Sequence, residues 1–293
     1  MSSAKAIRGK IKSVTNTRKI TTAMEMVAAS KMRKAQEEMM SMRPYANKVR
    51  CLAGHLLSAN TDYCHPYVFG NQADSRNVGF VVVSTDKGLC GGLNSSLFRY
   101  FLKCTEDETL DISSNFRVAT IGDRGYGFFR RMRVDVVAHV SLSEYKDKFS
   151  RILGVTKSML QLFDKNEISR LYILFNRFEN TMKQVPTLEQ LLPIKSVNEQ
   201  NDGVFSSSKV NYICEPNERE LIDLLLDRYV ENLVCEYIAE HNSSEQSARM
   251  VAMKAASDNA GEFIDHLKIE YNKSRQAAIT KELSEIVSGS SVV

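Results

Sequence analysis

Residues 250–271 read MVAMKAASDNAGEFIDHLKIEY, and their apolar or small side chains recur at alternating intervals of three and four residues. Continued to residue 278, the series is Met250, Met253, Ser257, Ala260, Ile264, Leu267, Tyr271, Ser274 and Ala278. This spacing is typical of helices that wind around one another in a left-handed coiled coil. The segment therefore predicts a helix that packs along a second helix.

The N-terminal segment repeats the pattern and is the obvious partner. Its series is Ile7, Ile11, Val14, Arg18, Thr21, Glu25, Ala28, Met32, Ala35, Met39 and Met42. Three polar residues interrupt this apolar seam, and there we expect the stripe to shift by one residue, to Ile20, Met24 and Val27.

The positions of proline and glycine define how long these helices are. No proline occurs in residues 1–43 or after Pro216, and a proline inside a helix costs about 3 kcal/mol. We therefore expect one helix over about residues 3–57, kinked at Pro44, and another from Asn217 to about residue 288, with Glu220 in capping-box spacing. The alternative is several shorter helices, with a break at residues 242–244.

The middle of the chain alternates between two kinds of segment. Runs rich in Val, Ile and aromatic residues predict strands at 78–84, 117–121, 134–140, 170–175 and 210–214, and helical stretches occupy 93–104, 126–132 and 149–163. Such alternation predicts an α/β domain with a mostly parallel, Rossmann-like sheet. The expected fold class is α/β, with this domain at 76–214 inserted between coiled-coil helices at 1–58 and 217–288.

Composition excludes several classes of protein. The chain has 293 residues, of which 43% are hydrophobic, and a net charge of +4. Its longest apolar run, residues 78–83, is far shorter than the roughly 20 residues of a membrane-spanning helix. The six cysteines form no C-x-x-C pair and the five histidines form no cluster with them, so we expect reduced thiols and no metal site.

Two glycine-containing turns are the candidates for a nucleotide site. Residues 86–94, DKGLCGGLN, follow the first expected strand, and residues 122–127 read GDRGYG. Neither has the spacing of a P-loop or of the dinucleotide fingerprint, so we favour structural turns. No signature of a catalytic triad or of a zinc protease occurs either. A dispersed active site stays open at this point.

Charge is distributed unevenly along the chain. Residues 1–58 hold twelve basic and three acidic residues, a net charge of +9, which leaves −5 for the remainder. A basic helix of this kind binds nucleic acid, an anionic membrane or an acidic protein surface, or is simply solvated. The first 24 residues also have the composition of a transit peptide, but the helical seam continues through Met32 and Met42.

Several long motifs carry a resemblance to a known family. Residues 20–32, ITTAMEMVAASKM, and 275–289, RQAAITKELSEIVSG, closely resemble the two signature helices of the gamma subunit of F-type ATP synthases. Residues 83–94, 184–187 and 248–254 extend the likeness over essentially the whole chain. Because the likeness begins near Lys5, we expect no transit peptide. The cysteine-bearing insertion of chloroplast relatives is also absent, so we expect a bacterial protein without redox control through Cys90 or Cys104. The two residues after Gly289, which are Ser290 and Ser291, depart from the ending that is usual in the family.

The resemblance implies a rotor. In this family the terminal helices form an antiparallel coiled coil inside a ring of alpha and beta subunits, and proton flow through the c-ring turns the shaft. It implies one copy per complex on the cytoplasmic face of the bacterial membrane, with no cofactor, metal, catalytic residue, nucleic acid or small-molecule substrate. Residues matching ring contacts are Met24, Lys31, Arg249, Arg275, Gln276, Thr280 and Glu282, and those matching the foot on the c-ring and the epsilon subunit are Tyr212 and Glu215.

Two other functions compete with the rotor. A coiled-coil protein that binds nucleic acid would use the same basic helix, and its affinity would fall steeply with salt. A nucleotide-dependent enzyme would use the turn at Gly88, and saturable ATP binding by the isolated chain would favour it.

Overall fold

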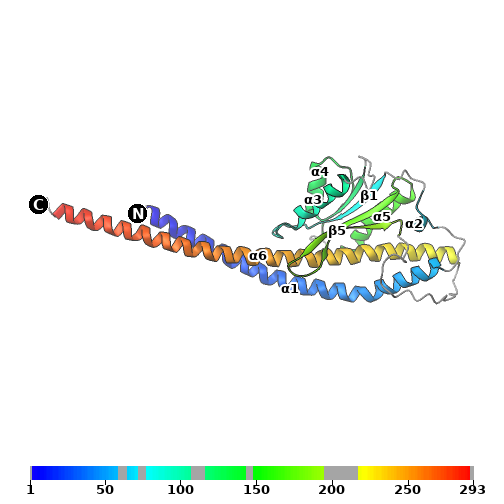
Figure 1. Ribbon diagram of the computed structural model, residues 1–293, viewed down its shortest axis with the longest axis horizontal. Helices are drawn as coiled ribbons and strands as arrows, with labels where there is room; N and C mark the ends of the chain where they lie inside the picture. Colours follow the sequence, from blue (N-terminus) through cyan, green and yellow to red (C-terminus); the bar gives the residue numbers. More distant parts are fainter. Residues whose placement is uncertain are drawn as a thin grey trace. The chain divides into compact units, whose positions relative to one another are not determined.

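The computed structural model describes residues 2–58, 65–71, 77–106, 116–142, 148–194 and 217–290. In chain order, one long helix precedes a series of shorter helices and strands, and a second long helix follows it (Figure 1). The elements are α1 (Ser2–Ser58), α2 (Pro66–Phe69), β1 (Val78–Val83), α3 (Leu93–Glu106), β2 (Arg117–Ile121), α4 (Asp123–Arg131), β3 (Val136–Val140), α5 (Lys148–Asp164), β4 (Arg170–Phe178), β5 (Gln184–Leu192) and α6 (Glu218–Ser290).

Both terminal helices are continuous over their described length. Pro44 lies inside α1 without ending it, and α6 runs unbroken through Asn242, so the alternative of several shorter helices is wrong. Asn217 caps the start of α6 as expected, but its bond to Glu220 comes from the side-chain amide and not from the backbone N–H of a full capping box. The Glu220 N–H donates to Asn217 Oδ1 at 2.9 Å, and Asn217 Nδ2 donates to the Glu220 carboxylate at 2.7 Å.

The chain divides into two compact units. One contains residues 1–30 and 249–293, and the other contains residues 31–248. Each long helix contributes its terminal part to the first unit and its remaining part to the second. No helix of the described ranges is long and apolar enough to cross a membrane.

The second unit is built on a five-stranded sheet in the order β3-β2-β1-β4-β5. Strands β1 to β4 are parallel, and β5 is antiparallel to β4. Four of the expected strands are confirmed, whereas the one at residues 210–214 lies outside the described residues. The sequence pattern missed β5, which contains Pro186; an edge strand tolerates a proline because one side of its backbone needs no partner.

Helices cover both faces of this sheet. Along β1, Val78, Phe80 and Val82 pack with α3 and α4, while the alternate residues Val81 and Val83 pack with α5, α6 and the end of α1. All six residues of β1 are buried, which explains why its sequence is a continuous apolar run without polar alternation. The expected α/β fold with long terminal helices is therefore what the chain forms.

Candidate functional site

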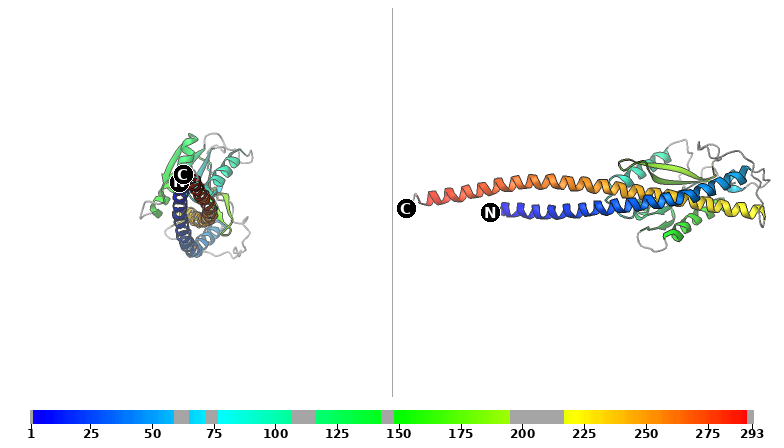
Figure 2. Two further views of the ribbon diagram at one scale, coloured as in Figure 1. Left: turned by 90° about the vertical axis from the view of Figure 1, so that its left-hand side faces the viewer. Right: turned by 90° about the horizontal axis from the view of Figure 1, so that it is seen from below.

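The first unit is an antiparallel pair of helices. The Thr22 hydroxyl hydrogen-bonds with that of Ser257 at 2.8 Å, and the Arg18 guanidinium lies beside Gly261. All nine positions of the expected α6 seam, from Met250 to Ala278, are buried or half-buried. Figure 2 shows the two chain termini at the same end of this pair. The seam of α6 is thus confirmed position by position.

The expected shift of the α1 stripe is confirmed at Met24, which is half-buried, and wrong at Ile20 and Val27. Ile20 and Val27 are 60% and 54% exposed, whereas Thr21 and Glu25 are half-buried in the unshifted seam. Of the three polar residues in the seam, Arg18 is exposed.

The ring-contact residues expected from the resemblance occupy different environments. Met24 and Arg249 are half-buried in the first unit, and Lys31 is exposed at the start of the second. The other four, all exposed on α6, are Arg275, Gln276, Thr280 and Glu282. Tyr212 and Glu215 lie outside the described residues. A single surface patch does not unite these positions, because they are spread along both helices.

Exposed apolar side chains gather near the end of α6. Ile279, Leu283 and Ile286 are 49%, 58% and 67% exposed, and their spacing places them on one side of the helix. The pairing at Thr22 and at Arg18 sets a register in which Ser2 lies opposite Ala277, so this C-terminal ridge extends beyond the first turn of α1 (Figure 1). Apolar surface of this kind is typical of an interaction site.

The two paired helices differ in charge. The basic side chains Lys5, Arg8 and Lys12 line a shallow hollow near the start of α1. On α6, Asp265 accepts a hydrogen bond from Lys268 at 2.8 Å, and this bond together with the nearby Arg18 holds the pKa of Asp265 below its usual value. The N-terminal helix therefore presents a positive surface beyond its apolar seam.

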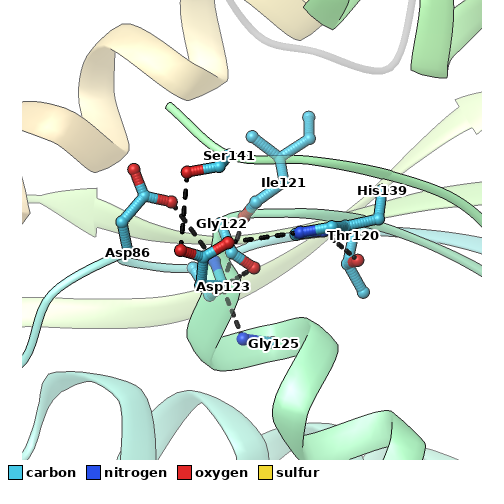
Figure 3. A network of polar contacts seen from close by, with 9 residues as sticks. Asp86, Thr120, Ile121, Gly122, Asp123, Gly125, His139 and Ser141 are labelled. Atoms are coloured by element: carbon cyan, nitrogen blue, oxygen red, sulfur yellow. Dashed lines mark hydrogen bonds and ion pairs between the residues drawn. The ribbon is translucent and has the colours of Figure 1, made fainter. Parts of the chain in front are cut away.

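The glycine-rich turns meet at the carboxyl edge of the sheet (Figure 3). The Asp123 N–H donates to Asp86 Oδ1 at 3.2 Å, so a carboxylate of this chain occupies the N-terminus of α4. The carboxylate of Asp123 in turn lies 3.2 Å from His139 Nε2. An anion favours the N-terminus of a helix, and two carboxylates disfavour a phosphate at this one. The geometry suits the structural turn that the glycine spacing indicated.

A cluster of ionisable groups in the second unit escaped the sequence reasoning. The Tyr67 hydroxyl hydrogen-bonds with Asp164 and Asp227, and His65 Nε2 lies 3.3 Å from Asp223. Burial, followed by the neighbouring carboxylate, raises the pKa of Asp164 and of Asp227. The spacing of Asp223 and Asp227 on α6 was visible in the sequence, but no local pattern linked it to the other groups. Within the described ranges, no group of three such side chains is placed to hold a metal ion.

Comparisons with known proteins agree with this architecture. A family model described as ATP synthase matches residues 3–293. The ATP synthase gamma chain of Polaromonas naphthalenivorans is 50% identical over 293 residues, and that of Paraburkholderia xenovorans is 49% identical over 296, each match covering the whole of both chains.

Solved structures share the fold at low sequence identity. A chain of the Euglena gracilis mitochondrial ATP synthase rotor has a TM-score of 0.65 at 16% identity, with 95% of this chain and 99% of that one covered. A chain of the Tetrahymena thermophila central stalk and c-ring structure has a TM-score of 0.60 at 22% identity, with 81% and 99% covered. From the family match and the full-length bacterial relatives, the chain belongs to the ATP synthase gamma chain family.

Proposed function

We propose that the chain is the central-stalk rotor subunit of a bacterial F-type ATP synthase. By rotating inside the ring of alpha and beta subunits, it couples proton flow through the membrane sector to ATP synthesis at the beta subunits. The chain is one copy per complex, a peripheral subunit on the cytoplasmic face of the membrane, and it supplies no catalytic residue or cofactor site. Its three parts are residues 1–58, 76–214 and 217–288.

The observation that carries this proposal is the C-terminal ridge on an otherwise paired helix. Two paired helices that differ in charge, apolar exposure and end point form an asymmetric object. When such an object turns within a ring of equivalent sites, its contact free energy differs at each site, so its angle selects their conformations. A helix of 73 residues, about 110 Å long at 1.5 Å per residue, provides the reach for such a shaft.

The contact residues are assigned by resemblance to the family. Arg275, Gln276, Thr280 and Glu282 precede and surround the ridge on α6 and have exposed side chains suited to hydrogen bonds and ion pairs with the ring. Met24, Lys31 and Arg249 contact the same ring at positions farther from the C-terminal end of α6. Tyr212 and Glu215 serve the c-ring and the epsilon subunit, by resemblance alone.

Reconstitution tests the proposal. The chain is mixed with bacterial alpha and beta subunits, the complex is isolated by size, and its ATP hydrolysis is measured. We expect one copy in an active complex. No association of a folded chain would overturn the proposal, and it would direct attention to nucleic acid and to ATP binding by the isolated chain.

A matched pair of variants locates the contact. Leu283→Asp places a charge on the ridge, and Leu224→Asp places one elsewhere on the same helix at the same 58% exposure. We expect Leu283→Asp to lower the hydrolysis of the alpha, beta and gamma complex at least five-fold and Leu224→Asp to leave it within two-fold. Equal effects of the two variants would show that the ridge is not a special contact.

A further inference from the structure

Strand β4 extends beyond the strand beside it. Its pairing with β1 covers Arg170 to Leu174, but β4 continues to Phe178 before the chain turns into β5. Backbone N–H and C=O groups at the free edge of a strand require partners when they are buried. Beyond Leu174, these partners are side chains of α6, which passes next to this hairpin (Figure 1).

Four side chains of α6 bind this backbone directly. His241 Nδ1 accepts the Asn176 N–H at 3.2 Å, and the Ser244 hydroxyl donates to the Asn176 carbonyl at 2.9 Å. Further along the hairpin, Glu240, next to His241, accepts the Phe178 N–H at 3.3 Å, and the Ser247 hydroxyl, about one turn after Ser244, donates to the Thr181 carbonyl at 2.8 Å. We call this set, Glu240, His241, Ser244 and Ser247, the helix–strand clamp.

The clamp interrupts the apolar packing of α6 on the sheet. Earlier on the same helix, Val230, Val234 and Ile238 bury against the sheet in the ordinary way. In the clamp region the buried residues of α6 are polar, and among the described residues the carboxamide of Asn176, His241 Nε2 and Ser243 Oγ have no hydrogen-bond partner. Buried polar atoms without partners destabilise the folded state. These atoms offset part of the stability that the bonds to the β4 backbone contribute, so satisfying that backbone explains the polar interface only in part.

The directionality of hydrogen bonds is a second reason for polar side chains at this interface. Hydrogen bonds fail beyond about 3.5 Å or at poor angles, whereas apolar contacts tolerate small displacements. A slip of α6 by one residue would move it by about 1.5 Å and rotate it by about 100°, which would break all four bonds together. The imidazole of His241 is fully buried, and burial lowers its pKa to about 3, so its Nδ1 is available as an acceptor.

We propose that Glu240, His241, Ser244 and Ser247 are positioning residues that hold α6 in one axial register and one rotational setting on the sheet. Torque that enters the second unit then passes into α6 without slip. This inference rests on the proposed rotor function, and it concerns how the shaft is held rather than what it contacts.

Amide hydrogen exchange of the full chain tests the clamp itself. The variant Ser244→Ala/Ser247→Ala removes two hydroxyl donors with little change in volume, and Ser158→Ala removes an exposed hydroxyl that bonds only within α5. We expect the amides of residues 176–182 to exchange roughly five-fold faster for each clamp bond removed, and to be unchanged in Ser158→Ala. Unchanged exchange in the double variant would overturn the clamp. If that variant does not accumulate, Ser247→Ala alone gives the same comparison with a five-fold effect.

Coupling in the assembled, membrane-bound complex tests the positioning role. ATP hydrolysis and ATP-driven proton pumping are measured in the same vesicles. We expect the double variant to keep hydrolysis within two-fold of the wild type and to lose at least half of the pumping per ATP hydrolysed. Faster exchange with an unchanged ratio of pumping to hydrolysis would overturn the positioning role. Failure of the rotor function itself is distinct, because the wild-type chain would then fail to enter the complex.

Discussion

Gly122 is the residue whose substitution should reveal most about how the sheet edge is held. It has a φ of 101°, and a Cβ added there would lie 2.1 Å from the Ser84 carbonyl oxygen. Ser84 joins the ends of β1 and β2, since its N–H donates to the Ile121 carbonyl at 2.8 Å and its hydroxyl accepts the Gly125 N–H at 2.8 Å. The perturbation is Gly122→Ala.

The expected loss has two parts. A non-glycine residue held in this backbone region costs about 1–3 kcal/mol. Forcing backbone atoms apart to admit the methyl group costs a further 1–3 kcal/mol or so, because the obstacle is a carbonyl group and not a flexible side chain. We therefore expect Gly122→Ala to lower the free energy of unfolding by about 4 kcal/mol.

Gly127 provides the matched control on the same helix. A Cβ added there has no heavy atom within 4 Å. Since alanine is favoured over glycine in a helix by about 1 kcal/mol, Gly127→Ala should raise the free energy of unfolding by up to that amount. The two variants, five residues apart, should differ in sign and by about 5 kcal/mol in total.

Urea unfolding of the full chain measures the difference. The chain contains no tryptophan, and all of its tyrosines except Tyr271 belong to the second unit, so near-ultraviolet circular dichroism of the tyrosines reports mainly that unit. A Gly122→Ala variant within about 1 kcal/mol of the wild type would refute the reasoning. So would a Gly127→Ala variant as unstable as Gly122→Ala.

Three further predictions concern stability. Gly261→Ala should stabilise the helix pair by up to about 1 kcal/mol in urea unfolding, because its Cβ would meet the Arg18 guanidinium at an ordinary 3.4 Å; a clear loss would contradict that packing. Burial, and then Glu231, raise the pKa of Asp227, so the contribution of Asp227 to stability is favourable at low pH and is lost as pH rises. Asp227→Asn should therefore stabilise the chain at pH 7, and this gain in the free energy of unfolding should shrink near pH 4. Because the pKa of His241 is depressed, the contribution of the neutral imidazole to stability is present above about pH 6.5 and is lost as pH falls toward 3. Relative to His241→Gln, the free energy of unfolding of the wild type should fall by about 1.4 kcal/mol per pH unit in that window. Parallel curves of stability against pH for the two proteins would contradict a buried neutral imidazole.

Local signals predicted the seam of α6 and four strands. Met253, Ser257, Ile264 and Leu267 are buried at the expected spacing because helix periodicity alone decides which side chains share a face. The same reasoning was wrong at Ile20 and Val27. Which face of α1 is buried at these positions depends on its packing against α6, and the α1 sequence alone does not report that packing.

The membership in a gamma chain family and the existence of two long terminal helices were determined by the sequence itself, through proline distribution, heptad spacing and long motifs. Only the tertiary structure placed His241 and Ser244 of α6 on the backbone of Asn176, and Tyr67 between Asp164 and Asp227. The physical reason is that periodicity reports the orientation of neighbouring side chains within one element. Contacts between residues some 65 to 160 positions apart depend on how the chain packs in three dimensions, and no local pattern records that.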